Sequence, residues 1–98
     1  MATSKEYRDY VLEQLRSIEG ISCKPMMGEY LLYNNNLLFG GIYDNRVLVK
    51  KTASLSQMDL PSAIPYDGAK EMYEIDIEET QKVSQIISLV CEDLKKKA

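Results

Sequence analysis

Residues 25–51 read PMMGEYLLYNNNLLFGGIYDNRVLVKK, and this stretch decides the fold. It predicts three β-strands joined by two short turns. The turn at Asn34–Asn36 follows from asparagine, which tolerates a left-handed backbone and bonds its own main chain. The turn at Asp44–Asn45 is a two-residue hairpin loop that favours positive φ. The three predicted strands are Gly28–Tyr33, Leu37–Tyr43 and Arg46–Lys51.

An amphipathic helix is predicted before this meander. Either Thr3 or Ser4 can cap its first turn, and Thr3 with Glu6 has the spacing of a capping box. Gly20 follows the last apolar residue of the pattern, as a C-terminal glycine does. The apolar stripe of this helix consists of Tyr7, Val11, Leu15 and Ile18.

Shorter elements are predicted on either side of the three strands. Ile21–Lys24 alternates and is stopped by Pro25, which indicates a weak or edge strand. Ala53–Leu60 predicts a short helix, and Pro61–Asp67 predicts a loop. Glu71–Ile77 alternates as a further strand that must pair with residues distant in sequence.

A second amphipathic helix is predicted at the end of the chain. Asp76 with Glu79 resembles a capping box at its start. Its apolar face consists of Val83, Ile86, Ile87, Val90, Cys91 and Leu94. We therefore expect residues 1–98 to form one α+β domain. It would be a two-layer sandwich in which an antiparallel meander sheet of about five strands packs against N- and C-terminal helices.

The composition argues against several classes of function. The 98 residues contain no histidine, the commonest general base and metal ligand, and the two cysteines lack a metal-ligand spacing. We expect no enzyme, no catalytic residue, no cofactor and no metal. Cys23 and Cys91 are interpreted as reduced, buried thiols, although a disulfide stays possible if the fold brings them together.

Charge and hydropathy indicate where the protein acts. The net charge is −3, and basic residues cluster only at Lys50–Lys51 and Lys95–Lys97. Direct nucleic-acid binding is therefore not expected, because such binders usually carry a basic stripe. The N-terminus has no apolar signal segment, and no apolar run is long enough to span a membrane. We expect a cytoplasmic protein.

Both faces of the meander are apolar by simple alternation. One set comprises Leu31, Tyr33, Leu37, Phe39, Tyr43, Val47 and Val49, and the other comprises Tyr30, Leu32, Leu38, Ile42 and Leu48. An antiparallel sheet usually buries only one face. Either the helices divide between the two faces or a partner covers one of them. We favour a partner, and the simplest partner is a second copy in a homodimer.

The candidate interaction surface combines aromatic residues, glycines and one lysine. Gly40–Gly41 inside a strand indicates a bulge or tight packing, or else a ligand that approaches the backbone. The tyrosines are either rim residues of the core or a recognition surface. Lys50, like Lys24, is either simply exposed or able to bind an anion. The predicted surface is Tyr30, Tyr33, Phe39, Gly40, Gly41, Tyr43 and Lys50.

An acidic run overlaps the last predicted strand and the start of the last helix. Its members are Glu71, Glu74, Asp76, Glu78 and Glu79. We interpret the run as a solvated strand face and as favourable charge at a helix N-terminus. Docking of a basic partner is the alternative.

These motifs resemble the N-terminal domain of the TfoX/Sxy family of bacterial competence regulators. The matching positions are Met26, Gly28, Tyr30, Leu32, Tyr33, Phe39, Ile42, Asp44, Val47, Lys50, Pro65–Tyr66 and Met72–Ile75. The departures are Met27 in place of phenylalanine, Glu29 and Leu31 in place of glycines, Asn35–Asn36 in place of an acidic-glycine turn, and Gly40 in place of alanine. The second domain of full-length family members has no counterpart here, so the chain resembles a stand-alone N-terminal domain.

The resemblance implies a fold like that of type III secretion chaperones, which commonly dimerise. It also implies a role in transcriptional control, exercised through a protein such as the cyclic-AMP receptor protein rather than through DNA bases. No catalytic residues are implied. We therefore expect a small regulatory, protein-binding domain that forms a homodimer. The alternative is a small-molecule or anion-binding domain that uses Gly40–Gly41, Lys50 and the tyrosines.

Overall fold

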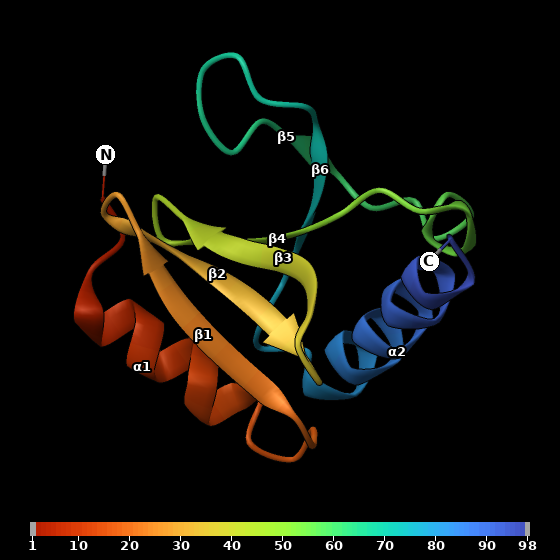
Figure 1. The fold of residues 1–98 in the computed structure, drawn as a ribbon, viewed down its shortest axis with the longest axis horizontal. Helices are drawn as coiled ribbons and strands as arrows, with labels where there is room; N and C mark the ends of the chain where they lie inside the picture. The colour runs from red at the N-terminus through yellow and green to blue at the C-terminus, as the bar shows by residue number, and fades with distance from the viewer. Residues whose placement is uncertain (1, 98) are drawn as a thin grey trace.

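The computed structural model describes residues 2–97 as one open antiparallel sheet with two helices, an α+β fold (Figure 1). Six strands lie in the order β1-β2-β3-β4-β6-β5, and each neighbouring pair is antiparallel. The predicted fold class is confirmed, with one strand more than expected. The elements are α1 (Lys5–Gln14), β1 (Ile21–Met26), β2 (Glu29–Asn34), β3 (Leu37–Tyr43), β4 (Arg46–Val49), η1 (Ala53–Leu55), β5 (Ser62–Ala63), β6 (Met72–Ile75) and α2 (Thr80–Lys97).

Left-handed turns connect the first four strands. Asn35–Asn36 has φ values of 51° and 68°, and Asp44–Asn45 has 53° and 56°, so both predicted turns are confirmed. Met27–Gly28 forms a third such turn, with φ values of 51° and 88°. The prediction that Pro25 ends the first strand is wrong, because β1 continues through it to Met26. An edge strand such as β1 tolerates the missing N–H of proline.

The helix starts differ in detail from the predictions. Ser4 caps α1 by accepting a 3.1 Å hydrogen bond from the Tyr7 N–H, so the predicted capping box of Thr3 and Glu6 is not used. The predicted cap at Asp76 is wrong, because its side chain accepts from the Glu78 N–H while α2 begins only at Thr80.

The segment between β4 and β6 also departs from its prediction. The helix expected over Ala53–Leu60 is a single 3₁₀ turn, η1. The expected loop contains β5, a two-residue strand paired with β6. Asp59 has a positive φ of 51°, which a right-handed helix does not allow, so the predicted helix cannot run to Leu60.

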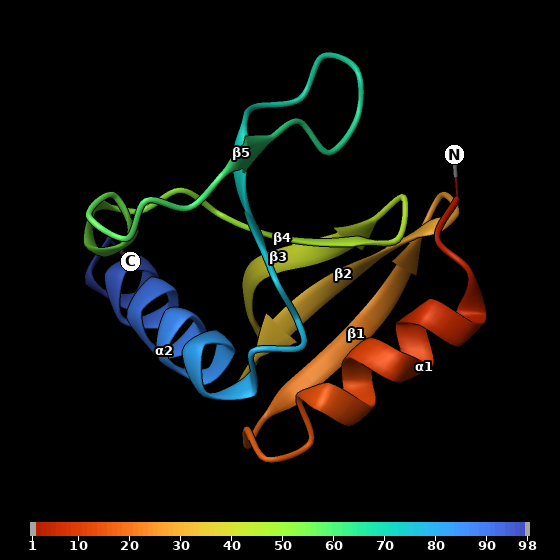
Figure 2. The same ribbon diagram turned by 180° about the vertical axis from the view of Figure 1, so that it is seen from behind.

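Both helices pack on the same face of the sheet (Figures 1 and 2). Val11 of α1 and Leu15, its C-cap residue, share one buried cluster with the apolar face of α2 and with the sheet residues beneath. This cluster also contains Tyr30, Leu32, Phe39, Ile42, Val47, Val49, Leu55, Ile75, Ile77, Val83, Ile86, Ile87, Val90 and Cys91. The helices therefore do not divide between the two faces, and the opposite face of the sheet has no helix over it.

A β-bulge in β3 decides which side chains reach the helices. Leu32 pairs with Gly40, but Tyr33 pairs with Leu38, so Phe39 has no partner on β2. An extra residue of this kind interrupts the alternation of side chains. Phe39 consequently points to the helix side, where it is fully buried.

The two apolar sets predicted by simple alternation are therefore wrong in composition. The two-residue loop pairs Tyr43 with Arg46, which places Val47 opposite Ile42 on the helix side. Val49 follows Val47 to that side, and Leu48 pairs with Gly41 on the other. We call the helix-free side the open face, defined by Leu31, Tyr33, Leu38, Tyr43 and Leu48.

Candidate functional site

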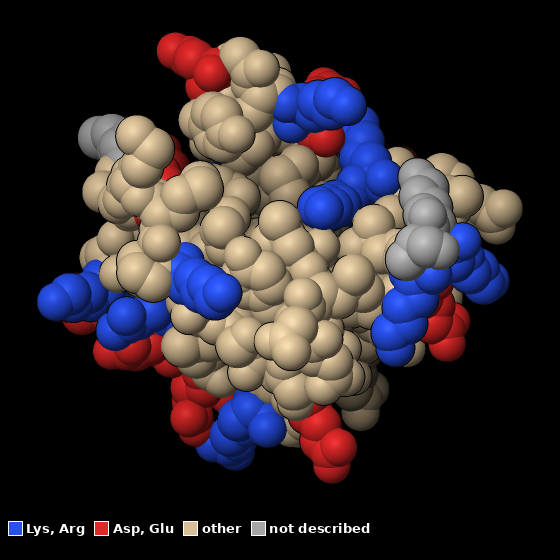
Figure 3. Space-filling model, in the orientation of Figure 1, with Lys and Arg blue, Asp and Glu red and all other residues tan. Residues whose placement is uncertain are grey.

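The open face is apolar and only partly covered. The segment 64–71 contacts it beside the β3–β4 hairpin: the Tyr66 ring lies 6.2 Å from the Tyr43 ring at the end of β3, and Nη2 of Arg46 at the start of β4 donates to the Ile64 carbonyl at 3.3 Å. Tyr43 and Leu48 are buried there. Toward β1 the cover ends, and Leu31, Tyr33 and Leu38 are half-buried. Figure 3 shows the result, a broad uncharged surface with charged side chains around its edge.

The predicted surface residues divide between the two sides of the sheet. Tyr30 and Phe39 lie in the helix-side core, with exposed fractions of 8% and 0%. Tyr33 and Tyr43 lie on the open face, and Lys50 lies at its end, half-buried. The seven residues therefore do not form one continuous surface.

The glycine pair has a structural explanation. A Cβ on Gly41 would lie 2.7 Å from the Tyr30 carbonyl oxygen and 2.7 Å from the Tyr43 ring. A Cβ on Gly40 would collide with the backbone of Leu48 and lie 3.0 Å from Cα of Val49. Only glycine fits this close approach of strands, and the bulge interpretation accounts for it.

A groove of about 530 Å³ lies between the end of the open face and the segment 64–71. We call it the lysine groove, because Lys50, Lys51 and Lys70 line it. Lys51 donates a 2.9 Å hydrogen bond to Glu71 in an ion pair. Burial, followed by the nearby Tyr66, raises the pKa of Tyr43. The remaining lining residues are Leu38, Gly40, Tyr43, Pro65, Tyr66, Ala69, Glu71 and Met72.

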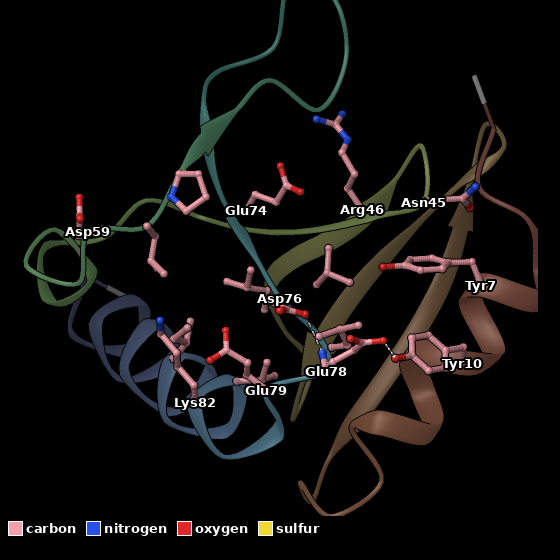
Figure 4. A pocket seen from close by; sticks show the side chains of 17 residues that line it. Tyr7, Tyr10, Asn45, Arg46, Asp59, Glu74, Asp76, Glu78, Glu79 and Lys82 are labelled. Atoms are coloured by element: carbon pink, nitrogen blue, oxygen red, sulfur yellow. Dashed lines mark hydrogen bonds between the residues drawn. The ribbon is translucent and has the colours of Figure 1, made fainter.

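A second groove, of about 400 Å³, lies between α1 and α2 on the other side (Figure 4). Tyr7 and Tyr10 of α1 point toward it, with ring centroids 5.9 Å apart. The Tyr10 hydroxyl donates a 3.1 Å hydrogen bond to Oε2 of Glu78. Burial, with the surrounding carboxylates, raises the pKa of Tyr7 and of Tyr10. We call this the interhelical groove; its carboxylates are Asp59, Glu74, Asp76, Glu78 and Glu79.

Some of the residues that line the interhelical groove belong to the acidic run noted in the sequence. Four residues of the acidic run line it, whereas the fifth, Glu71, pairs with Lys51 at the lysine groove. Tyr10 gave no sequence signal beyond its position three residues after Tyr7. Asp59 arrives from a segment predicted as helix, so only the tertiary structure brings it to this groove.

The described residues also bear on metals, thiols and membranes. Within residues 2–97 no three histidine, cysteine, aspartate or glutamate side chains come together as metal ligands. Cys23 and Cys91 are free, and Cys91 is buried. Over the same range, neither helix combines the length and apolarity required to cross a membrane.

The chain matches no protein-family model. It is 32% identical over 91 residues to a protein of Spirochaeta aurantia described as "Uncharacterized 12.7 kDa protein in trpE 5'region". The match covers 89% of this chain and 79% of the relative. A similarity of this length relates whole domains rather than a short shared motif.

Proposed function

The chain belongs to the family of the Spirochaeta aurantia protein, and we propose that it is a non-catalytic, protein-binding module that forms a homodimer through the open face of its sheet. One observation carries the proposal: an apolar sheet face that neither helix covers (Figures 1 and 2). Exposed apolar patches of this kind mark interaction sites, because their burial against a partner removes apolar surface from water.

The distribution of charge favours a second copy as the occupant. The five residues that define the open face are uncharged, and Lys24 of the edge strand β1 pairs with Leu31 and lies with Nζ 5.2 Å from the Tyr33 ring centroid. A two-fold axis that keeps the two copies of Lys24 apart would bring uncharged surface together. Basic and acidic side chains both stand around its edge in Figure 3. Such a mixed edge allows opposite charges of the two copies to pair across the interface.

A regulatory role is the second part of the proposal. Its support is the resemblance of the meander to the TfoX/Sxy N-terminal domain, which suggests action through another protein. The net charge of −3 supports protein rather than nucleic acid as the partner. Tight, salt-dependent binding of the purified protein to random-sequence duplex DNA would contradict this part.

The oligomeric state tests the homodimer. Light scattering coupled to size-exclusion chromatography, across micromolar concentrations, should give twice the 11.2 kDa mass of the chain. Leu31→Lys places a charge in the open face and should give the monomer mass. Ser84→Lys on the exposed side of α2 is the matched control and should remain dimeric.

Circular dichroism must show that Leu31→Lys is folded for the comparison to hold. A wild-type protein that stays at the monomer mass throughout the concentration range would overturn the homodimer. A dimer that Leu31→Lys leaves intact would show that the open face is not the interface.

A further inference from the structure

We propose that the lysine groove binds a small organic anion, namely a carboxylate attached to a flat apolar body. The size of the groove suits such a ligand, since small-molecule sites range over roughly 300–1,000 Å³ and this groove encloses about 530 Å³. Its floor is the sheet at Leu38 and Tyr43, and the segment 64–71 forms the opposite wall with Pro65 and Tyr66.

The charge of the groove selects an anion. Three lysines line it, while Glu71 is its single carboxylate. Glu71 pairs with Lys51, so one positive charge is already balanced. Lys50 and Lys70 form no ion pair with any residue between 2 and 97, and Lys50 is half-buried. Two unbalanced ammonium groups in a protein of net charge −3 form a local positive site that a carboxylate can neutralise.

The walls select an apolar, flat body behind the anionic group. The rings of Tyr43 and Tyr66 are 6.2 Å apart and tilted by 51°, so they meet at the groove as an aromatic corner. Leu38, Pro65 and Met72 complete the apolar lining. A few polar groups on otherwise apolar walls are typical of sites for small ligands.

Binding of 1-naphthoate, measured by isothermal titration calorimetry and by NMR, tests the proposal. Wild-type protein should bind 1-naphthoate at least about tenfold more tightly than 1-naphthalenemethanol, which has the same rings without the charge. Inorganic phosphate should also bind more weakly, because it lacks the apolar body. The NMR signals of Tyr43 and Tyr66 should shift on addition of 1-naphthoate.

Lysine variants locate the site. Lys50→Gln and Lys70→Gln should each weaken 1-naphthoate binding by about threefold to fivefold. Lys5→Gln, an exposed lysine of α1 that lines neither groove, is the matched control and should leave the affinity unchanged.

Four results would overturn the proposal. The first is equal affinity for 1-naphthoate and its alcohol, and the second is phosphate binding as tight as that of 1-naphthoate. The third is a Lys50→Gln variant that binds like the wild type. The fourth is tighter binding of a polyglutamate peptide, which would assign the groove to an acidic protein segment. The homodimer is judged separately, because Leu31→Lys leaves every groove residue in place.

Discussion

Oε1 of Glu29 accepts two hydrogen bonds from Thr3, one from its backbone N–H at 2.9 Å and one from Oγ1 at 2.7 Å. The same oxygen accepts from the Asp44 N–H at 3.1 Å, and the Asn45 N–H donates to Oγ1 of Thr3 at 3.2 Å. The pair therefore fastens the segment before α1 to the β3–β4 hairpin. Thr3 is buried, so its polar groups depend on protein acceptors, whereas Glu29 is half-buried.

Glu29→Ala should destabilise the protein by about 2 kcal/mol, because it removes the charged acceptor of three hydrogen bonds. Thr3 would keep only its bonds to the carbonyl oxygens of Gly28, at 3.0 Å from its N–H, and of Ile42, at 3.3 Å from Oγ1. Urea unfolding followed by circular dichroism measures this difference. Glu19→Ala is the control, since Glu19 is exposed and its side chain forms no hydrogen bond within the described residues. Equal stability of the two variants would show that the Thr3–Glu29 contact contributes little.

Thr3 also shows where local sequence patterns stop being informative. Its spacing from Glu6 fits a capping box, yet its hydroxyl bonds to Glu29, 26 residues away. Ser4, one residue on, provides the cap instead. The preference for serine and threonine at helix starts leaves Thr3 and Ser4 as candidates for the cap. Glu29 of β2 binds the Thr3 hydroxyl, which leaves Ser4 to cap α1.

Gly40→Ala should destabilise by about 3 kcal/mol, because the added Cβ would meet backbone atoms of Leu48 and Val49, which no side-chain rotation can relieve. Gly68→Ala is the comparison. Gly68 has open space around it but a φ of 85°, so its cost should be about 1 kcal/mol and purely conformational. Thermal unfolding of both variants should show that Gly40→Ala loses more stability than Gly68→Ala. A larger loss for Gly68→Ala would contradict the tight approach of β3 and β4.

The bulge beside Gly40 explains how much of the candidate site was predictable. Strand and turn positions follow from alternation and from asparagine chemistry, and β3 has the predicted bounds. The side of the sheet to which Phe39 points does not follow from alternation, because the extra residue of the bulge interrupts the alternation of side chains along β3. Both helices pack on one side of the sheet, which rules out the alternative that they divide between its two faces, and the residues of the remaining apolar face had to be reassigned. The grooves depend on the path of segment 64–71 and on the placement of α1, which long-range packing determines.

Asp93→Asn should reduce stability at neutral pH and have a smaller effect in acid. Ser54 donates to Asp93 through its N–H at 2.9 Å and its hydroxyl at 2.7 Å, and these bonds hold the pKa of Asp93 below its usual value. A carboxyl whose pKa is lower in the folded state stabilises the fold above its unfolded pKa, about 3.9 for aspartate. That contribution is lost as the pH falls through the lower, folded pKa.

The melting temperatures of wild type and Asp93→Asn should therefore differ at pH 7 and approach each other below about pH 3. Asp67→Asn, an exposed aspartate without a hydrogen bond in the described residues, controls for the general effect of removing a carboxylate. A difference that stays constant across this pH range would exclude ionisation of Asp93 as the cause.

The two thiols should react slowly with iodoacetamide, and Cys91 more slowly than Cys23. Burial raises the pKa of both, with Arg8 opposing the effect at Cys23 and Lys95 at Cys91, so little thiolate forms at neutral pH. Cys91 is only 4% exposed, whereas Cys23 is half-buried on the edge strand β1. Mass spectrometry of timed reactions should show that both thiols are labelled more slowly than free cysteine, and that Cys91 is labelled more slowly than Cys23. In the Cys23→Ser variant only the slow labelling of Cys91 should remain. Fast labelling of Cys91 in that variant would show that α2 does not protect it.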